Sequence, residues 1–281
     1  MRWDERVFIV LLVFVYLPGL HALSQVWSSV DYYSHGYLVP VVSLWAARRE
    51  RNRWQALPAW REWRGLGLLL SALLLYAFGL TAGNVSLQGL SLVACAAGTL
   101  WFLRGFAWLR ALAFPVFFLV FMVPLPSDWL TPVIVKLQLF VSKAAVAGLH
   151  ALEVAVVREG NVIVLPGNQT LFVAEACSGV TSLVTLLPLA VFLAYFTASG
   201  IWRRAVLIAA VVPIAMFGNL LRVVVTVGAA LRLGVERATR SALHDSAGLF
   251  TFLIGCLLLV ALGVLLQRVG GSRREPPRAA V

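Results

Sequence analysis

Long apolar segments separated by short polar ones run through almost the whole chain. Several reach the roughly 20 apolar residues that a helix needs to cross the hydrocarbon core of a membrane. The second segment is short and contains Pro40. The pattern predicts an all-α polytopic membrane protein, a single domain over 1–281 with about eight transmembrane helices, at 7–23, 36–47, 65–82, 84–103, 110–124, 176–197, 205–231 and 246–267.

Residues 125–175 form the one long insert between predicted spans. Its first part is long enough to cross a membrane, but polar residues interrupt it, among them Lys136, Gln138, Ser142 and Lys143. We therefore expect a helix lying along the outer interface or dipping into it, with its basic residues at the headgroups. If this segment spans instead, everything downstream of it is inverted.

The second part of the insert has the pattern of strands. Between residues 154 and 176, β-branched residues flank two turn signals, Glu159-Gly160-Asn161 and Pro166-Gly167-Asn168. This predicts a small β-meander on the outer face. Its last strand is expected to lead directly into Cys177.

Composition and charge fix the class and the orientation. The 281 residues are 61% hydrophobic and 12% charged, with mean hydropathy +0.90, which excludes an ordinary soluble domain. The net charge of +11 lies mainly in loops. Eight spans with both ends cytoplasmic place 16 of the 23 basic residues inside, as the positive-inside rule requires. The first span is either a retained anchor or a cleaved secretory signal, and both leave the later spans in the same orientation.

Three widely spaced cysteines match neither a disulfide framework nor a metal site. Cys95 and Cys256 fall mid-span among small apolar residues, where a thiol packs as a small hydrophobe. Cys177 differs because it stands where an extended segment meets a helix. Free N–H groups at a helix start stabilise a thiolate, which is a competent nucleophile. Glu175 is either a capping or orienting carboxylate or a solvated strand end.

Arg222 lies inside an apolar span, where a guanidinium costs about 2.5 to 3.5 kcal/mol and needs protein or water around it. Asn219 and Thr226 fall on the same helix face, giving a polar stripe. The alternative is an arginine that reaches the outer headgroups. The chemical role that fits is electrostatic, lowering a thiol pKa and stabilising an oxyanion.

His244 stands just before the last span, followed by Asp245. An imidazole suits proton transfer near neutral pH, although a histidine beside a helix cap is the simpler interpretation when it is taken alone. Cys177, Arg222 and His244 share one membrane face in the predicted topology, which favours thiol-based acyl chemistry. His35 and His150 are expected to be interfacial residues. The sequence gives no sign of a metal or organic cofactor.

The chain resembles the exosortase/archaeosortase family of membrane cysteine transpeptidases. The resemblance covers about residues 30 to 265 and depends on EACSG around Cys177, GNLLR ending at Arg222, and His244 before the final span. Three further motifs support it, YSHGYLVP at 33–40, VPLP at 123–126 and REGNVIVLP at 158–166. Val180-Thr181 departs from the best-known members and leaves the subfamily open.

The resemblance implies a multi-pass enzyme of the cytoplasmic (inner) membrane, with its active site on the extracytoplasmic side and its catalytic helices within 176–267. Its partners are exported proteins that carry a C-terminal sorting signal, often Pro-Glu-Pro, then a transmembrane helix and a basic tail. Cys177 corresponds to the nucleophile, Arg222 to the transition-state stabiliser and His244 to the general acid/base. Two alternatives stay open: a purely hydrolytic membrane cysteine protease, and a transporter whose Arg222 binds an anion.

Overall fold

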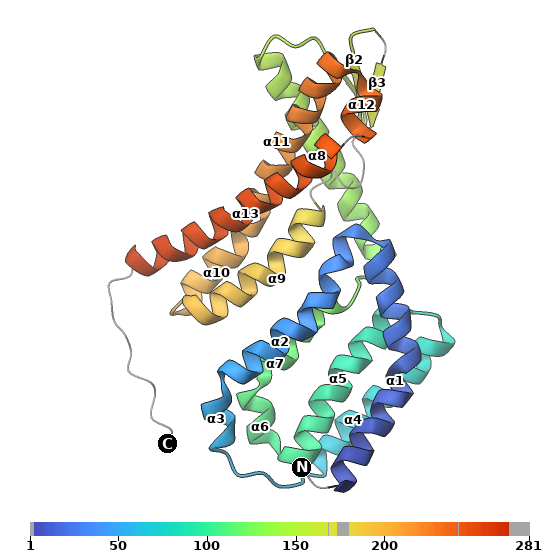
Figure 1. Ribbon diagram of the computed structural model, residues 1–281, viewed down its shortest axis with the longest axis vertical. Helices are drawn as coiled ribbons and strands as arrows, with labels where there is room; N and C mark the ends of the chain where they lie inside the picture. The colour runs from blue at the N-terminus through green and yellow to red at the C-terminus, as the bar shows by residue number, and fades with distance from the viewer. Residues whose placement is uncertain (1–2, 168, 173–179, 241, 270–281) are drawn as a thin grey trace. The chain divides into compact units, whose positions relative to one another are not determined.

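The computed structural model divides into two compact units, residues 1–129 (unit 1) and 130–281 (unit 2), and each is described by itself. The structure describes residues 3–167, 169–172, 180–240 and 242–269, with the backbone alone for 239–240, 242–247 and 269. Both units consist mainly of helices (Figure 1). The expectation of a single membrane domain concerns how the units associate and stays a prediction.

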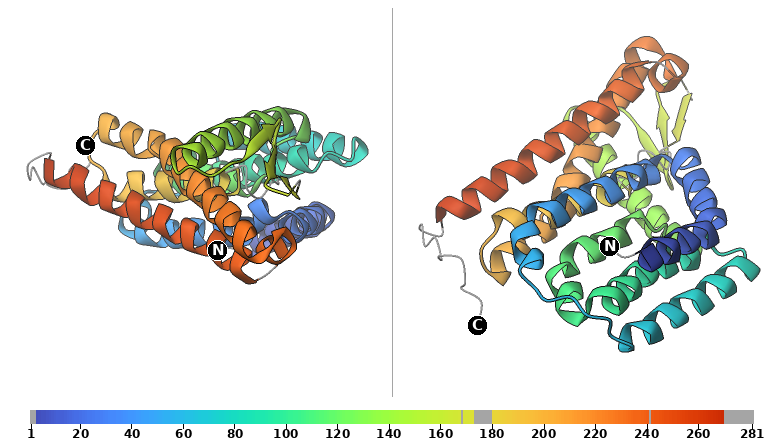
Figure 2. Two further views of the ribbon diagram at one scale, coloured as in Figure 1. Left: turned by 90° about the horizontal axis from the view of Figure 1, so that it is seen from above. Right: turned by 60° about the horizontal axis from the view of Figure 1, so that its bottom comes forward.

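Unit 1 is entirely helical over its described residues. Its elements in chain order are α1 (Trp3–Ser29), the 3-10 helix η1 (Asp31–Tyr37), α2 (Leu38–Arg49), α3 (Arg51–Gln55), α4 (Arg64–Thr81), α5 (Val85–Arg104), α6 (Phe106–Ala111), α7 (Ala113–Phe118) and the 3-10 helix η2 (Leu119–Met122). Helices α4 and α5 form an antiparallel hairpin, seen from two further directions in Figure 2. Glycine allows close approach there, since a Cβ at Gly98 would lie 2.7 Å from the backbone nitrogen of Leu69.

One end of unit 1 gathers charged residues from segments far apart in the sequence. Both guanidinium Nη atoms of Arg104 donate to the carboxylate of Glu5, at 2.9 and 2.8 Å, and Arg61 pairs with Asp4. The backbone N–H of Phe106 donates to Glu62 at 2.9 Å. The start of α1, the loop before α4 and the junction of α5 with α6 therefore meet at this end.

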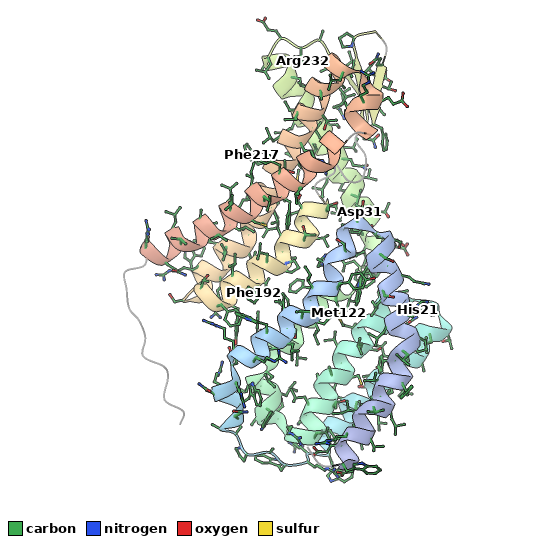
Figure 3. The ribbon with its side chains drawn as sticks, in the orientation of Figure 1. His21, Asp31, Met122, Phe192, Phe217 and Arg232 are labelled. Atoms are coloured by element: carbon green, nitrogen blue, oxygen red, sulfur yellow. The ribbon has the colours of Figure 1, made fainter. Side chains whose placement is uncertain are left out.

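The opposite end of unit 1 is held by hydrogen bonds between η1 and the chain around η2. The indole of Trp27 donates to the carbonyl of Met122 at 2.9 Å, and the backbone N–H of Leu125 donates to the Tyr33 hydroxyl at 2.7 Å. Figure 3 labels Asp31 at this end, at the start of η1, away from the N-terminus. Helix α1 therefore leads from the charged end to the η1 end.

The predicted span at 36–47 is a continuous helix of only 12 residues, α2, whereas the predicted span at 110–124 is broken into the end of α6, α7 and η2. The α2–α3 segment runs back from η1 to the charged end, where the Trp54 and Trp108 rings lie 5.0 Å apart, and the α6–α7–η2 segment returns to the η1 end. Midway, the Ser43 hydroxyl donates to the carbonyl of Pro115 at 2.7 Å. The helix breaks are tolerated because neighbouring helices satisfy the backbone groups that they free.

Across the described residues, seven helices are long and apolar enough to cross a membrane, and Ala113–Met122 is a shorter apolar one. The chain is therefore a multi-pass helical membrane protein, as the hydrophobic pattern predicts. Six of the seven lie on predicted spans, and the two short passes of unit 1 are the other two of the eight predicted spans. The remaining candidate is the first helix of the insert.

Unit 2 combines helices with one small sheet. Its elements are α8 (Ser127–Ala151), which begins at the boundary with unit 1, β1 (Val157–Glu159), β2 (Val162–Leu165), β3 (Gln169–Phe172), α9 (Val180–Thr197), α10 (Ile201–Ala209), α11 (Val211–Leu233), α12 (Val235–Arg240) and α13 (Ala242–Val269). The predicted span at 205–231 is thus divided between α10 and α11, three residues before Pro213.

The predicted β-meander is confirmed as a three-stranded antiparallel sheet of order β1-β2-β3. Its two turns contain Gly160 and Gly167, which adopt φ values of 65° and 80°, a left-handed conformation that glycine tolerates without strain. Ile163, Leu165 and Leu171 are buried in one cluster with α8 and α11. The last strand ends at Phe172, five residues before Cys177.

Helix α8 differs in part from the expectation. It is a continuous 25-residue helix, apolar enough to cross a membrane, and its polar residues Gln138 and Ser142 are buried against the sheet. Ser142 donates to the carbonyl of Gly160, and Asn161 donates to Gln138. Lys136 and Lys143, seven residues apart, are exposed. Its orientation in the membrane stays a prediction.

Candidate active site

The polar stripe predicted on α11 lies inside unit 2. Asn219 is 3% exposed and Thr226 is 6% exposed, so both side chains are enclosed by protein although the span around them is apolar. The Thr226 hydroxyl donates to the carbonyl of Arg222 at 2.9 Å, which removes one polar group from the apolar surroundings. Arg222, between them, is half-buried, and its Nε is shielded from solvent. Burial of a guanidinium at this depth indicates a function for it.

The guanidinium of Arg222 lies directly against Gly248 on α13. A Cβ built at position 248 would be 3.1 Å from Cζ, 3.1 Å from Nη2 and 3.2 Å from Nη1. These separations are tighter than ordinary van der Waals contact, so an alanine there would displace the guanidinium. Gly248 therefore provides the surface on which the charged group rests. Gly248 was not predicted from the sequence as a site residue. Its position four residues after His244, on the same helix face, was a signal that could have indicated it.

The helices α9, α11 and α13 meet at one level along their length, about two turns from the contact between Arg222 and Gly248. A Cβ at Gly255 would lie 3.0 Å from Leu186 and 3.6 Å from Ile214, and one turn further on Gly218 faces Thr251. Counting 1.5 Å per residue from that level, Arg222 lies about 12 Å away, Gly248 about 10 Å and Val180 about 9 Å. The start of α9, the guanidinium and Gly248 are thus at nearly the same depth.

The other end of the same three helices is distinct from this level. Gln267 donates to the carbonyl of Thr197 at 3.1 Å, and Arg204 donates to the carbonyl of Ala198 at 3.2 Å. The basic residues Arg203, Arg204 and Arg268 therefore lie toward one end of unit 2 and Arg222 toward the other. This matches the relative polarity predicted for the last three spans.

The sheet adjoins the Arg222 level through α11. Val223 and Val227, one residue and five residues beyond Arg222, are buried with Ile163 of β2. Val223, Val227 and Ala230 lie one helical period apart in turn, so a continuous apolar face of α11 receives the sheet. The sheet therefore packs on a face of α11 that begins one residue beyond Arg222.

Comparison with known families decides what this arrangement belongs to. Residues 27–261 match the family model described as transmembrane exosortase (Exosortase_EpsH). The chain belongs to the transmembrane exosortase family. No match was found among curated proteins or among solved structures. Membership supports a membrane transpeptidase or protease role in general, and exported proteins with a sorting signal as the general class of substrate.

Two of the three residues expected to carry exosortase chemistry lie wholly or partly outside the described residues. Cys177 and Glu175 fall within 173–179, outside the described ranges. His244 and Asp245 belong to the first turn of α13, and their side chains lie outside the described part. Of the predicted catalytic residues, the structure places the side chain of Arg222 alone, and the three assignments stay predictions.

Two motifs upstream in this exosortase pack against each other in unit 1. His35 of YSHGYLVP lies with its Nε2 3.1 Å from the carbonyl of Phe121, two residues before VPLP, while Tyr33 bonds Leu125 inside that motif. Burial lowers the pKa of His35 and raises that of Tyr33, with hydrogen bonds to the backbone opposing each shift. His150 instead contacts the carbonyl of Val156 at 2.6 Å.

No group of three or more His, Cys, Asp or Glu side chains in the described ranges could hold a metal ion. Cys95 is buried within the α1–α4–α5 core, and Cys256 is half-buried among α9 and α11 residues, so both pack as small hydrophobes.

Proposed function

We propose that this exosortase is a cysteine transpeptidase in which Cys177 is the nucleophile, Arg222 stabilises the transition state and His244 is the general acid/base. The observation that supports it is the half-buried guanidinium of Arg222, seated on Gly248. His244 precedes Gly248 by four residues on α13, one helical turn, and Cys177 precedes Val180, the first residue of α9, by three residues in the sequence. These sequence separations support the proposal that the thiol and the imidazole meet the guanidinium of Arg222.

The proposed reaction has two halves. The Cys177 thiolate attacks a substrate carbonyl, the C–S bond forms, the peptide C–N bond breaks, and protonated His244 gives its proton to the departing amine. An acceptor nucleophile then attacks the thioester and gives its proton to the now neutral His244, the bond from the acyl carbon to the acceptor forms, the C–S bond breaks and the Cys177 thiolate leaves. Arg222 faces the oxyanion in both tetrahedral states, where a preorganised cation is worth most. Asn219 would support Arg222 from the same face of α11. Glu175 would orient the chain around Cys177, and Asp245 would orient the imidazole of His244.

We further propose that the site faces the extracytoplasmic side of the cytoplasmic membrane. The arginines at the far end of unit 2 support this, because basic ends stay inside. The substrate's sorting signal would then present its cleavage motif, such as Pro-Glu-Pro, at the outer interface while its transmembrane helix and basic tail stay behind.

The first test replaces Cys177 by alanine. We expect conversion of a co-expressed exported protein from precursor to processed form, followed by immunoblot, to stop while the enzyme level is unchanged. Cys256→Ala is the matched control and should process normally. Processing by Cys177→Ala at the wild-type rate would exclude the thioester route.

The mass of the released product separates transfer from hydrolysis. A free carboxylate on the cleaved protein means that water is the acceptor, and an added mass means transfer to another nucleophile. Arg222→Lys should impair processing severely in either case, because an ammonium lacks the planar fork of a guanidinium.

A further inference from the structure

Unit 1 contains a cavity of about 420 Å³ between α1 and α5. These two helices run antiparallel beside each other (Figure 1). Apart from Arg104 at one end, the walls are almost wholly apolar. The residues of α1 that line it, from Ile9 to Leu20, precede the region matched by the family, which begins at residue 27. All wall residues belong to unit 1 and the proposed catalytic residues to unit 2, so the cavity does not depend on the catalytic assignment.

The inner part of the cavity offers no polar partner to a ligand. Tyr16 lines it, but its hydroxyl donates to the carbonyl of Ser91 at 3.2 Å, and its ring stacks on Tyr76 at 4.2 Å. Cys95 and Thr99, also in the wall, lie 4.0 Å apart through their side-chain S and O atoms. A hydrocarbon is thus the group that this part of the cavity can accept without leaving a polar atom unsatisfied.

The length of the cavity corresponds to one leaflet of a bilayer. From Ile9 to Leu20 the α1 wall is about 17 Å long, against roughly 15 Å for half of the hydrocarbon core. A helix about 10 Å in diameter would need on the order of 1,300 Å³ over that length. A hydrocarbon chain about 4 Å across needs on the order of 200 Å³. The cavity has room for an acyl chain and not for a helix.

One end of the cavity lies at the charged end of unit 1. Arg104 lines the cavity there, and its charge is balanced by Glu5. Arg6 is exposed one turn beyond Ile9, and Arg110 is exposed two residues beyond Trp108, another wall residue. An anionic headgroup above the cavity would meet these cations, because juxtamembrane arginines attract anionic lipid.

We propose that this cavity is a binding site for one acyl chain of an anionic phospholipid, taken from the leaflet on the arginine-rich side. The apolar walls hold the chain, the length selects one leaflet, and Arg6 and Arg110 select the headgroup charge. The site would couple the first helix to α5 through bound lipid.

The test uses the full-length chain, delipidated in detergent and titrated with phosphatidylglycerol or with phosphatidylcholine of the same acyl chains, and counts bound lipids by native mass spectrometry. We expect one phosphatidylglycerol to bind more tightly than further copies and than phosphatidylcholine. Replacing Arg6 and Arg110 by glutamine should weaken that first site about fivefold for each charge removed.

Plugging the cavity gives the decisive comparison. Ala96→Phe places a ring inside the cavity and should weaken the first phosphatidylglycerol site at least tenfold. If Ala96→Phe fails to fold, Val13→Trp replaces it, because Val13 is an exposed residue of the wall and a larger ring there should weaken the same site. Val10→Phe, exposed on the same helix but outside the wall, is the matched control and should bind as wild type.

Two outcomes would overturn the proposal. In the first, phosphatidylglycerol and phosphatidylcholine bind equally well and neither plug variant changes their binding, which means a nonspecific lipid shell. Stoichiometric displacement of phosphatidylglycerol by an apolar helical peptide with a basic tail means that the cavity accepts a protein helix instead.

Discussion

At the residue scale, Gly248 controls the position of the Arg222 guanidinium. Gly248→Ala should lower the rate of substrate processing roughly ten- to hundredfold, because a displacement of the stabilising charge by a fraction of an ångström weakens transition-state contacts. Substrate binding should change little. The measurement is kcat and KM with a sorting-signal peptide and the purified protein.

The matched control for this variant is Gly228→Ala on α11, where an added Cβ meets nothing within 4 Å. In a background lacking Cys95 and Cys256, the pH profile of Cys177 alkylation gives a second readout. Gly248→Ala should shift the reactive pKa of the thiol upward, because the cation that favours the thiolate has moved. If both alanine variants keep wild-type turnover and profile, Gly248 only packs helices.

Residue patterns alone predicted some of the site and not the rest. An arginine in an apolar span is visible in the sequence, and so is the period that aligns it with Asn219 and Thr226. The contact with Gly248 is not visible, because it depends on which face of α13 packs on α11. Likewise the sequence showed Gln138 and Ser142 only as polar interruptions of an apolar segment, since only the folded sheet shows what buries them.

At the scale of elements, hydrogen bonds join η1 to the chain around η2. This joint holds the two short passes of unit 1, at 36–47 and 110–124, together. His35 contributes to it as a neutral side chain, since burial keeps its pKa below the ordinary value. Below about pH 6.5 the unfolded chain binds this proton while the folded chain resists it. The free energy of unfolding should therefore fall as pH drops from 7 to 5. Thermal unfolding in detergent at each pH measures this.

The variants that test this joint are His35→Gln and His21→Gln. The first removes the titrating group and should flatten the decline below pH 6.5, at some cost in stability at pH 7 because the bond to Phe121 is altered. His21 is exposed on α1, so its variant should follow the wild-type curve. An unchanged decline in His35→Gln would assign the pH dependence to other groups.

The boundaries of these elements show how much of the secondary structure the hydrophobic pattern could predict. Continuous apolar runs predicted α4, α5, α9 and α13 closely, because a helix in lipid must satisfy its own backbone. The passes at 36–47 and 110–124 were located, but the breaks that divide the second one into the end of α6, α7 and η2 were not, since neighbouring chain segments supply the missing bonds. The turns at Gly160 and Gly167 were predicted because glycine tolerates positive φ.

At the scale of the whole molecule, the arginines determine which face holds the proposed site, and α8 is the element on which this depends. If α8 lies along the interface, the sheet and the start of α9 face outward and Ser199 faces the cytoplasm. If α8 crosses, unit 2 is inverted while unit 1 is not. The positive-inside rule favours the first arrangement, because the second exports Arg203 and Arg204.

Single cysteines in a chain without Cys95, Cys177 and Cys256 distinguish the two arrangements. The four positions chosen, 34, 52, 169 and 199, are all exposed. Labelling of intact cells with an impermeant thiol reagent should modify Ser34→Cys and Gln169→Cys. It should spare Asn52→Cys and Ser199→Cys until the membrane is opened. Labelling of Ser199→Cys with protection of Gln169→Cys, while Ser34→Cys stays accessible, means that α8 spans. The thiol site would then face the cytoplasm, where an exported substrate could not reach it after translocation.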